Sequence, residues 1–330
     1  MKSPLTPAKA GAQAEPSTQR KRRMGSRLRG NERNRKWLAA ALPYVWLLVF
    51  FALPFLLVAK LSLSHTVLAI PPYAPQLDLS KGHAGVRAFV HELNFQTYGR
   101  LAGDRLYVLA YLSSLKFAAV ATALLLAIGY PIAYGMSRFA PATRRALVLA
   151  VILPFWTSFL IRIYAWIAIL KPAGLLNQAL AVLHLPPVSL LNTDAAVILG
   201  LVYAYLPFMV LPLYAVLERQ DRSLIEAAED LGCTRTSAFW RVTFPLSWPG
   251  VAAGALICFI PMVGEFVIPD LLGGSNTLML GRTLWTEFFA DRDWPAASAV
   301  AIVLLATLCV PIALFQRQQA PLLKEPGVAR

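Results

Sequence analysis

Six apolar stretches, each roughly as long as a helix that crosses a bilayer, divide this 330-residue chain. A spanning segment must satisfy its backbone polar groups internally, and the alternating pattern of a membrane β-barrel is absent. The chain is 57% apolar and only 15% charged, which excludes an ordinary soluble protein. We therefore predict an all-α integral membrane protein. Its six transmembrane helices are expected over residues 37–59, 111–134, 146–170, 195–217, 249–271 and 294–315.

The distribution of basic residues predicts the orientation of these helices. Outside the six stretches, one side carries 21 Lys and Arg and the other side carries eight. The positive-inside rule then places both termini in the cytoplasm. Residues 1–36 hold 11 basic and two acidic residues and almost no large apolar side chains, so we expect a disordered basic cytoplasmic tail. This tail would contact the lipid bilayer and no nucleic acid, because no aromatic residue is interleaved with its charge.

The cytoplasmic connection over residues 219–247 has the pattern of two short amphipathic helices. Ser223 and Glu226 form a capping box that begins the first helix, and Gly232 supplies its left-handed stop. The second helix is expected to end at Pro245. Such a pair is a compact docking element. The alternatives are a hairpin that lies on the lipid or a DNA-binding helix-turn-helix, and the membrane tethers at both ends disfavour the latter.

This connection resembles the EAA loop of the permease subunits of binding-protein-dependent ABC importers. The likeness rests on Glu226-Ala227-Ala228, on Gly232 and on the segment 242–245, in which Val and Phe replace the usual Ile and Leu. The resemblance implies a type I importer permease (MetI-like) fold for residues 37–318, with cytoplasmic tails before it and at 319–330. It also implies that the loop inserts into an ATPase subunit as a coupling helix. The implied coupling residues are Glu226, Ala227, Ala228, Gly232 and Pro245.

Further segments, at 153–166, 202–212, 263–274 and 291–295, resemble the permeases of polyamine importers, most closely the putrescine permeases of the PotH type. The resemblance implies a multi-pass protein of the bacterial cytoplasmic (inner) membrane that imports a polyamine, with putrescine expected. The implied partners are a dimer of ABC ATPase subunits, a second and different permease subunit, and a periplasmic polyamine-binding protein.

The sequence gives no sign of covalent chemistry. It contains no phosphate-binding loop, so we expect ATP and Mg on the partner ATPase and no cofactor on this chain. The three cysteines and four histidines have no metal-ligand spacing. One alternative function is a permease for another polyamine or solute. A stand-alone secondary transporter is also open, although the spans show no two-fold internal repeat.

Ionisable residues within the spans are functional candidates, because a charge at the bilayer centre costs roughly 2.5–3.5 kcal/mol. The candidates are Lys116, Arg162 and Glu265, with Asp270 near the outer end of the fifth span. Glu265 has two interpretations. It either pairs with Arg162 or Lys116 as an intramembrane ion pair, or it faces the substrate pathway and attracts a cationic amine.

Two aromatic residues complete the candidate pathway, and a pair of glycines predicts helix packing. Trp156 and Tyr205 offer faces for cation–π contact with an ammonium group, although packing in the bundle is the simpler role for an aromatic residue. The candidate pathway residues are therefore Glu265, Asp270, Trp156 and Tyr205. Gly250 and Gly254 form a Gly-x-x-x-Gly pair that predicts close helix packing, within the chain or against the second permease.

Overall fold

The computed structural model describes residues 41–76, 82–221 and 223–319. The expectations for the two tails at 1–36 and 319–330 lie outside these residues, apart from Gln319. The chain divides into two compact units, Met1–Leu57 and Val58–Arg330, and each is described by itself. The first unit contains helical residues 41–47 and the π-helical turn η1 (Leu48–Ala52).

The second unit is helical apart from one small strand pair in its described residues. In this pair β1 (His65–Thr66) runs antiparallel to β2 (Tyr73–Ala74), with His65 opposite Ala74. The prediction of an all-α protein is therefore confirmed. The remaining elements are α2 (Leu53–Ser62, which begins in the first unit), α3 (Gly82–Glu92), α4 (Gln96–Gly103), α5 (Arg105–Arg138), α6 (Pro141–Ile152), η3 (Leu153–Trp156), α7 (Phe159–Leu170), α8 (Leu175–Val182), α9 (Asp194–Glu218), α10 (Ser223–Asp230), α11 (Arg235–Ala238), η4 (Phe239–Thr243), α12 (Phe244–Val263), α13 (Val267–Leu272), α14 (Leu280–Trp285), η5 (Thr286–Ala290) and α15 (Trp294–Gln319).

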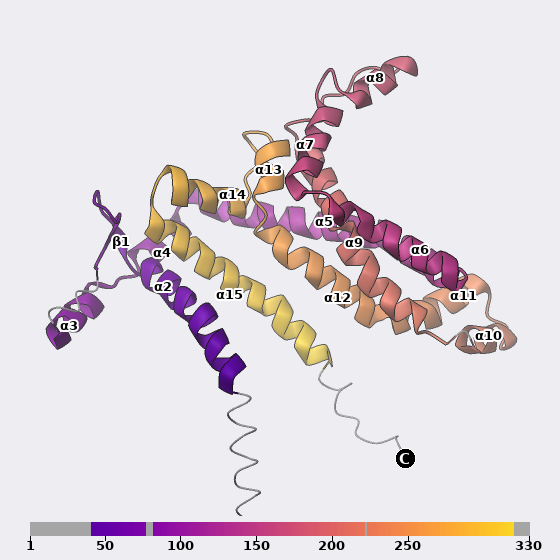
Figure 1. Cartoon of the computed structure of the whole chain (residues 1–330), viewed down its shortest axis with the longest axis horizontal. Helices are drawn as coiled ribbons and strands as arrows, with labels where there is room; N and C mark the ends of the chain where they lie inside the picture. The colour runs from indigo at the N-terminus through magenta and orange to yellow at the C-terminus, as the bar shows by residue number, and fades with distance from the viewer. Residues whose placement is uncertain (1–40, 77–81, 222, 320–330) are drawn as a thin grey trace, which may run out of the picture. The chain divides into compact units, whose positions relative to one another are not determined.

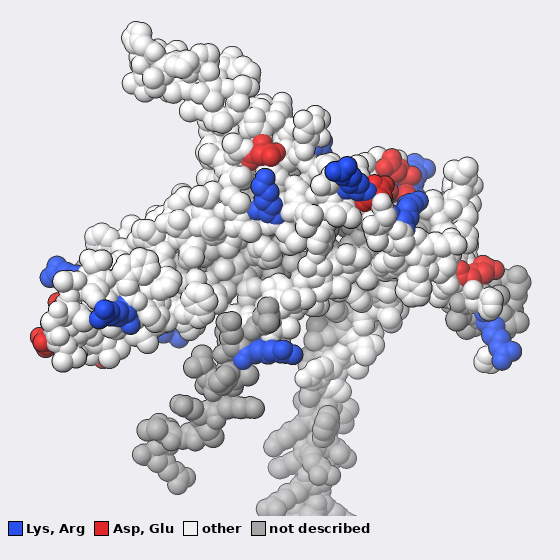
Figure 2. Space-filling model, turned by 180° about the vertical axis from the view of Figure 1, so that it is seen from behind, with Lys and Arg blue, Asp and Glu red and all other residues white. Residues whose placement is uncertain are grey.

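Six helical segments of the described chain are long and apolar enough to cross a membrane, as the sequence predicts. In Figure 2 the Lys, Arg, Asp and Glu side chains lie at the left, along the upper part, at the right and at one point of the lower edge, and the broad surface between them shows none, which fits a membrane-embedded body. The six segments are Ala41–Ser62, Arg105–Arg138, Phe159–Val182, Asp194–Glu218, Arg235–Val263 and Trp294–Arg317.

The core of the second unit lies between α5, α9 and α12, which pack most extensively against one another (Figure 1). Leu125, Met209 and Met262, one from each helix, are fully buried there. Gly254 brings α12 against α9, since a Cβ atom at this position would lie 2.9 Å from the Met209 sulfur, and Gly250 similarly faces Val216. The close packing predicted for the glycine pair is confirmed, and its partner is α9 of the same chain.

The third span is broken rather than continuous. The sequence predicts one helix over residues 146–170, but α6 ends at Ile152, η3 follows, and α7 begins only at Phe159. Pro154 has no N–H to continue the α-helical ladder, and Thr157 turns the chain by donating its N–H and hydroxyl to the Pro154 carbonyl, at 3.3 and 2.8 Å. Thr157 and Ser158 are extended. The third span is thus two helices joined by an irregular segment.

The fifth span also differs from the prediction at both ends. Pro245 does not end a helix, because the π-helical turn η4 accommodates it and the chain is helical from Arg235 to Val263. At the other end α12 ends at Val263, so Glu265 lies in an irregular segment before α13 rather than within a helix. Gly281 of α14 packs directly onto this segment, where a Cβ atom would overlap the backbone oxygens of Gly264 and Glu265.

We expect Gly281→Ala to destabilise the protein, because the added methyl group forces the break at Gly264 and Glu265 to move. Overpacking of this kind costs about 1–3 kcal/mol. Thermal unfolding of the purified protein in detergent should show a midpoint lowered by several degrees. Gly135→Ala is the matched control, because a Cβ atom at Gly135 meets nothing within 4 Å. Equal midpoints for the two variants would contradict this packing.

Candidate functional site

A cavity of about 480 Å³ lies where the broken third span meets α9 and α12. Thr157 at the break lines it, and so do Ile257 and Pro261 near the outer end of α12. Irregular backbone at membrane depth is tolerated where protein buries it or where it lines a cavity, and transporters bind their substrates at such broken helices. Four aromatic rings form much of the remaining wall: Phe155, Phe159, Tyr205 and Phe208.

Glu265 is joined to this cavity through Tyr205. The Tyr205 hydroxyl donates a hydrogen bond of 2.9 Å to one carboxylate oxygen of Glu265, and the Val267 N–H donates one of 3.1 Å to the other. The second break, between α12 and α13, therefore places a carboxylate directly behind the cavity wall. Two helix breaks from different spans meet at one site, since α13 contacts both α7 and α9.

Arg162 lines the same cavity but forms no ion pair with Glu265. Its guanidinium carbon lies 5.3 Å from the Phe155 ring centroid and 5.9 Å from that of Phe159, within cation–π range. Among the described residues, the buried Nε of Arg162 has no hydrogen-bond partner, and neither Arg162 nor Lys116 forms a salt bridge. The expected intramembrane ion pair is therefore not formed, because Tyr205 and Val267 hold the Glu265 carboxylate in the second break.

The structure does not bring the other two candidate pathway residues to the cavity. Asp270 on α13 pairs with Arg282, with 3.2 Å between Oδ1 and Nε, and Arg282 also donates to the Gly274 carbonyl. Trp156 is 80% exposed and does not line the cavity. Of the four candidates only Tyr205 and Glu265 contribute to the site. The sequence prediction missed Phe155, Phe159 and Phe208, although the proximity of Pro154 to the two earlier phenylalanines was an available signal.

The cytoplasmic loop is built from α10 and α11 around a glycine, as predicted. Gly232 has φ +86°, and Cys233 and Gly232 donate their N–H groups to the carbonyls of Ala228 and Glu229. This is the Schellman arrangement that ends a helix. The start of α10 differs from the prediction, in which Ser223 is the capping residue. The Ser223 N–H instead donates a hydrogen bond of 3.0 Å to the Asp221 carboxylate. That hydrogen bond lowers the pKa of Asp221.

The residues expected to couple to an ATPase lie on an accessible surface. Glu226, Ala227 and Gly232 are exposed, and Ala228 is half-buried. Leu231 beside them is 87% exposed, which is unusual for a large apolar side chain on a cytoplasmic loop. These features describe a surface suited to contact with another protein, and the five implied coupling residues remain predictions.

Aromatic packing joins this loop to the membrane helices. The ring of Phe239 in η4 meets the rings of Tyr130 and Tyr134 of α5 edge to face, with centroids 5.7 and 5.4 Å apart. The Tyr130 and Ser247 hydroxyls are hydrogen-bonded at 2.9 Å. Gln220 at the other end of the loop donates to the Thr243 carbonyl at 3.1 Å. The loop is therefore packed directly against α5 and α12.

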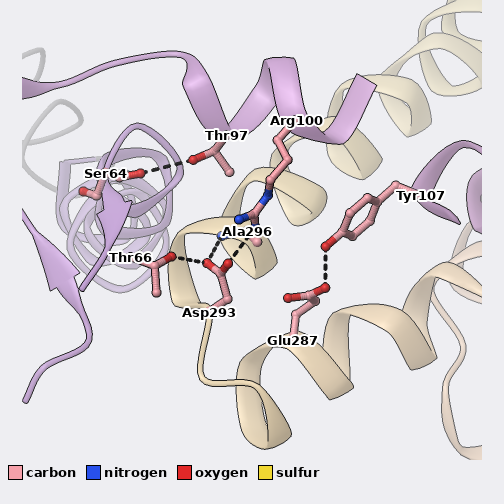
Figure 3. Close-up of polar contacts among 8 residues, drawn as sticks. All are labelled: Ser64, Thr66, Thr97, Arg100, Tyr107, Glu287, Asp293 and Ala296. Carbon is pink, nitrogen blue, oxygen red and sulfur yellow. Dashed lines mark hydrogen bonds and ion pairs between the residues drawn. The ribbon is translucent and has the colours of Figure 1, made fainter. Parts of the chain in front are cut away.

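Polar contacts tie together the outer ends of the helices (Figure 3). Asp293 accepts hydrogen bonds of 2.6 Å from both Arg100 and Thr66, and it caps α15 by accepting from the Ala296 N–H at 3.0 Å. Tyr107 donates to Glu287 beside this group. Burial alone would raise the pKa of Asp293, but the hydrogen bonds from Arg100 and Thr66 bring it below the usual value. Burial raises the pKa of Glu287.

Comparison with known proteins identifies the family. Residues 126–325 match the family model of the binding-protein-dependent transport system inner membrane component. The spermidine/putrescine transport system permease protein PotB of Haemophilus influenzae is 38% identical over 282 residues, which cover 85% of this chain and 92% of that protein. PotB of Escherichia coli K12 is 36% identical over 274 residues, which cover 82% and 93%.

A solved structure supports the fold. A chain of the bacterial alginate ABC transporter, in complex with an alginate pentasaccharide-bound periplasmic protein, superposes with a TM-score of 0.65 at 17% identity. The alignment covers 90% of this chain and 99% of that one. The family model and the PotB relatives define a multi-pass membrane transport component rather than an enzyme, and the fold and the six candidate spans agree with this.

The chain belongs to the family of binding-protein-dependent ABC importer permeases, with a MetI-like fold, in the inner membrane. Its PotB relatives are named for spermidine and putrescine together. The narrower resemblance to the PotH type, and a preference for putrescine, therefore stay predictions.

The outer polar contacts predict a pH dependence of stability. Because the folded pKa of Asp293 is lowered, its stabilising contribution is complete above the unfolded pKa and is lost as the pH falls through the folded pKa. Asp293→Asn keeps a good helix cap but removes the charge that pairs with Arg100, so we expect it to lower stability at neutral pH by about 0.5–1 kcal/mol, the scale of a partly exposed ion pair, and to weaken the loss below about pH 4. Thermal unfolding across pH measures this. Asp291→Asn, an exposed neighbour, should match wild type, and identical pH profiles for all three proteins would contradict the assignment.

Proposed function

We propose that this chain is a transmembrane permease subunit of an ATP-driven importer of polyamines, putrescine among them. The observation that carries the proposal is the aromatic cavity at two helix breaks, with the Glu265 carboxylate behind Tyr205. A polyamine is a flexible chain of methylene groups with ammonium groups at its ends. Aromatic faces attract such cations and accept the methylene groups, and the carboxylate supplies the opposite charge.

The proposed working unit contains this chain, a second and different permease, a dimer of ABC ATPases and a periplasmic polyamine-binding protein. Relatives named for spermidine and putrescine transport support the substrate class. The binding protein would deliver the polyamine at the outer side. ATP-driven closure of the ATPases would move the loop centred on Glu226 and Gly232, and the packing of Phe239 against Tyr130 would carry that movement into α5. The cavity would then open alternately to each side.

Glu265→Gln tests the site. The substitution keeps the shape of the side chain and one acceptor oxygen, which can accept from Tyr205 or from Val267, and it removes the negative charge that attracts an ammonium group. We expect uptake of labelled putrescine and spermidine to fall about tenfold or more, equivalent to about 1.4 kcal/mol. Asp270→Asn is the matched control, because this carboxylate pairs with Arg282, which does not line the cavity, whereas Glu265 is bonded to the lining residue Tyr205. Unchanged uptake by Glu265→Gln would remove this residue from the pathway.

Gly232→Pro tests the coupling loop. Proline cannot adopt the φ of +86° that ends α10, whereas asparagine tolerates left-handed backbone, so Gly232→Asn is the control. We expect the proline variant to insert normally, to lose ATPase copurification and to abolish uptake. Glu226→Lys should act in the same direction by reversing the charge of an exposed side chain. Normal ATPase copurification with both Gly232→Pro and Glu226→Lys would exclude the coupling role.

A further inference from the structure

The guanidinium of Arg162 lies against two aromatic faces of the cavity. Its guanidinium lies against the rings of Phe155 and Phe159, and all three residues line the cavity that the proposed function assigns to a polyamine. An aromatic face that binds a guanidinium is equally suited to an ammonium group, since both interactions arise from the quadrupole of the ring. A side chain of the protein thus occupies the place that suits one end of a cationic substrate.

The contacts that hold Arg162 are incomplete. Its Nε is buried without a hydrogen-bond partner among the described residues, and the same part of the chain offers it no carboxylate. Glu265, the carboxylate associated with this cavity, is already held by Tyr205 and Val267. An arginine that pairs with a carboxylate gains charge-assisted hydrogen bonds, often two in parallel, and the half-buried Arg162 makes no such pair among the described residues. Two phenyl faces therefore hold Arg162 more weakly than a salt bridge would.

The position of Arg162 in the chain allows the side chain to leave. It is the fourth residue of α7, directly after the extended Thr157 and Ser158, and its long apolar stem can carry the guanidinium away from the rings. A substrate with two or more positive charges competes with this guanidinium for the faces of Phe155 and Phe159, and like charges so close to one another repel. The observed position of Arg162 therefore disfavours binding of a cationic substrate to these faces.

We propose that Arg162 is a tethered cation that competes with the polyamine for the aromatic faces of the cavity and so keeps the affinity of the membrane site low. The inference rests on the proposed function and assigns a role to a residue that does not bind the substrate itself. Low affinity suits a transport pathway, because a tightly held substrate is released slowly. It also favours substrates that carry enough positive charge to displace the guanidinium.

The test is equilibrium binding of labelled spermidine to the complete importer in lipid nanodiscs, with the binding protein omitted. We expect Arg162→Gln to bind spermidine at least fivefold more tightly than wild type, and Arg162→Lys, which keeps the charge, to remain close to wild type. Lys116→Met is the matched control, because it removes an intramembrane cation that does not line this cavity. If Arg162→Gln does not assemble, Arg162→Met replaces it in the same assay with the same expected gain.

Binding by the neutral Arg162 variants that equals or is weaker than wild type would overturn the tethered-cation role and leave Arg162 as a structural residue. Failure of the proposed function is a separate result. It would appear as a wild-type importer whose ATP hydrolysis and uptake, with the binding protein present, do not respond to spermidine or putrescine. Normal responses together with unchanged binding by the variants would contradict only the role of Arg162.

Discussion

A helix that ends inside a bilayer leaves backbone groups without partners, and no water is at hand to satisfy them. This constraint governs where the chain can be irregular. The third span breaks before Phe159, where Thr157 satisfies the Pro154 carbonyl, and the fifth breaks after Val263, where α14 packs onto the backbone through Gly281. Both breaks are covered by protein or line one cavity. The candidate site is a consequence of two interrupted helices that share an environment.

The number and order of the spans could be predicted from the sequence, because the length of an apolar run is matched to the thickness of the bilayer. The interruptions could not be predicted, because a continuous helix and a broken one can have the same apolar sequence pattern. Pro245 is the opposite case, in which the sequence predicts the end of a helix and the structure has none. A proline normally ends a helix, but the π-helical turn at Phe239–Thr243 shifts the hydrogen bonds so that the helix continues through it.

The candidate site was only partly predictable for a related reason. Tyr205 and Glu265 could be selected individually, as an aromatic residue and an intramembrane carboxylate, but their hydrogen bond depends on the turn between α12 and α13. The same turn explains why the expected pairing of Glu265 with Arg162 is not formed. A charged residue within an apolar stretch can be selected from the sequence as a functional candidate, but the sequence does not identify its partner. In the structure Arg162 contacts aromatic rings rather than a carboxylate. The cytoplasmic loop was more predictable because the stop at Gly232 is a local backbone property.

The central claim is that the cavity between α7, α9 and α12 is the polyamine pathway. Cryo-electron microscopy of the complete importer, arrested during turnover with spermidine present, tests it most directly. The account predicts density for an extended chain among Phe155, Tyr205 and Phe208, with one end near Glu265. Density for spermidine elsewhere in the membrane domain, with this cavity empty, would contradict it.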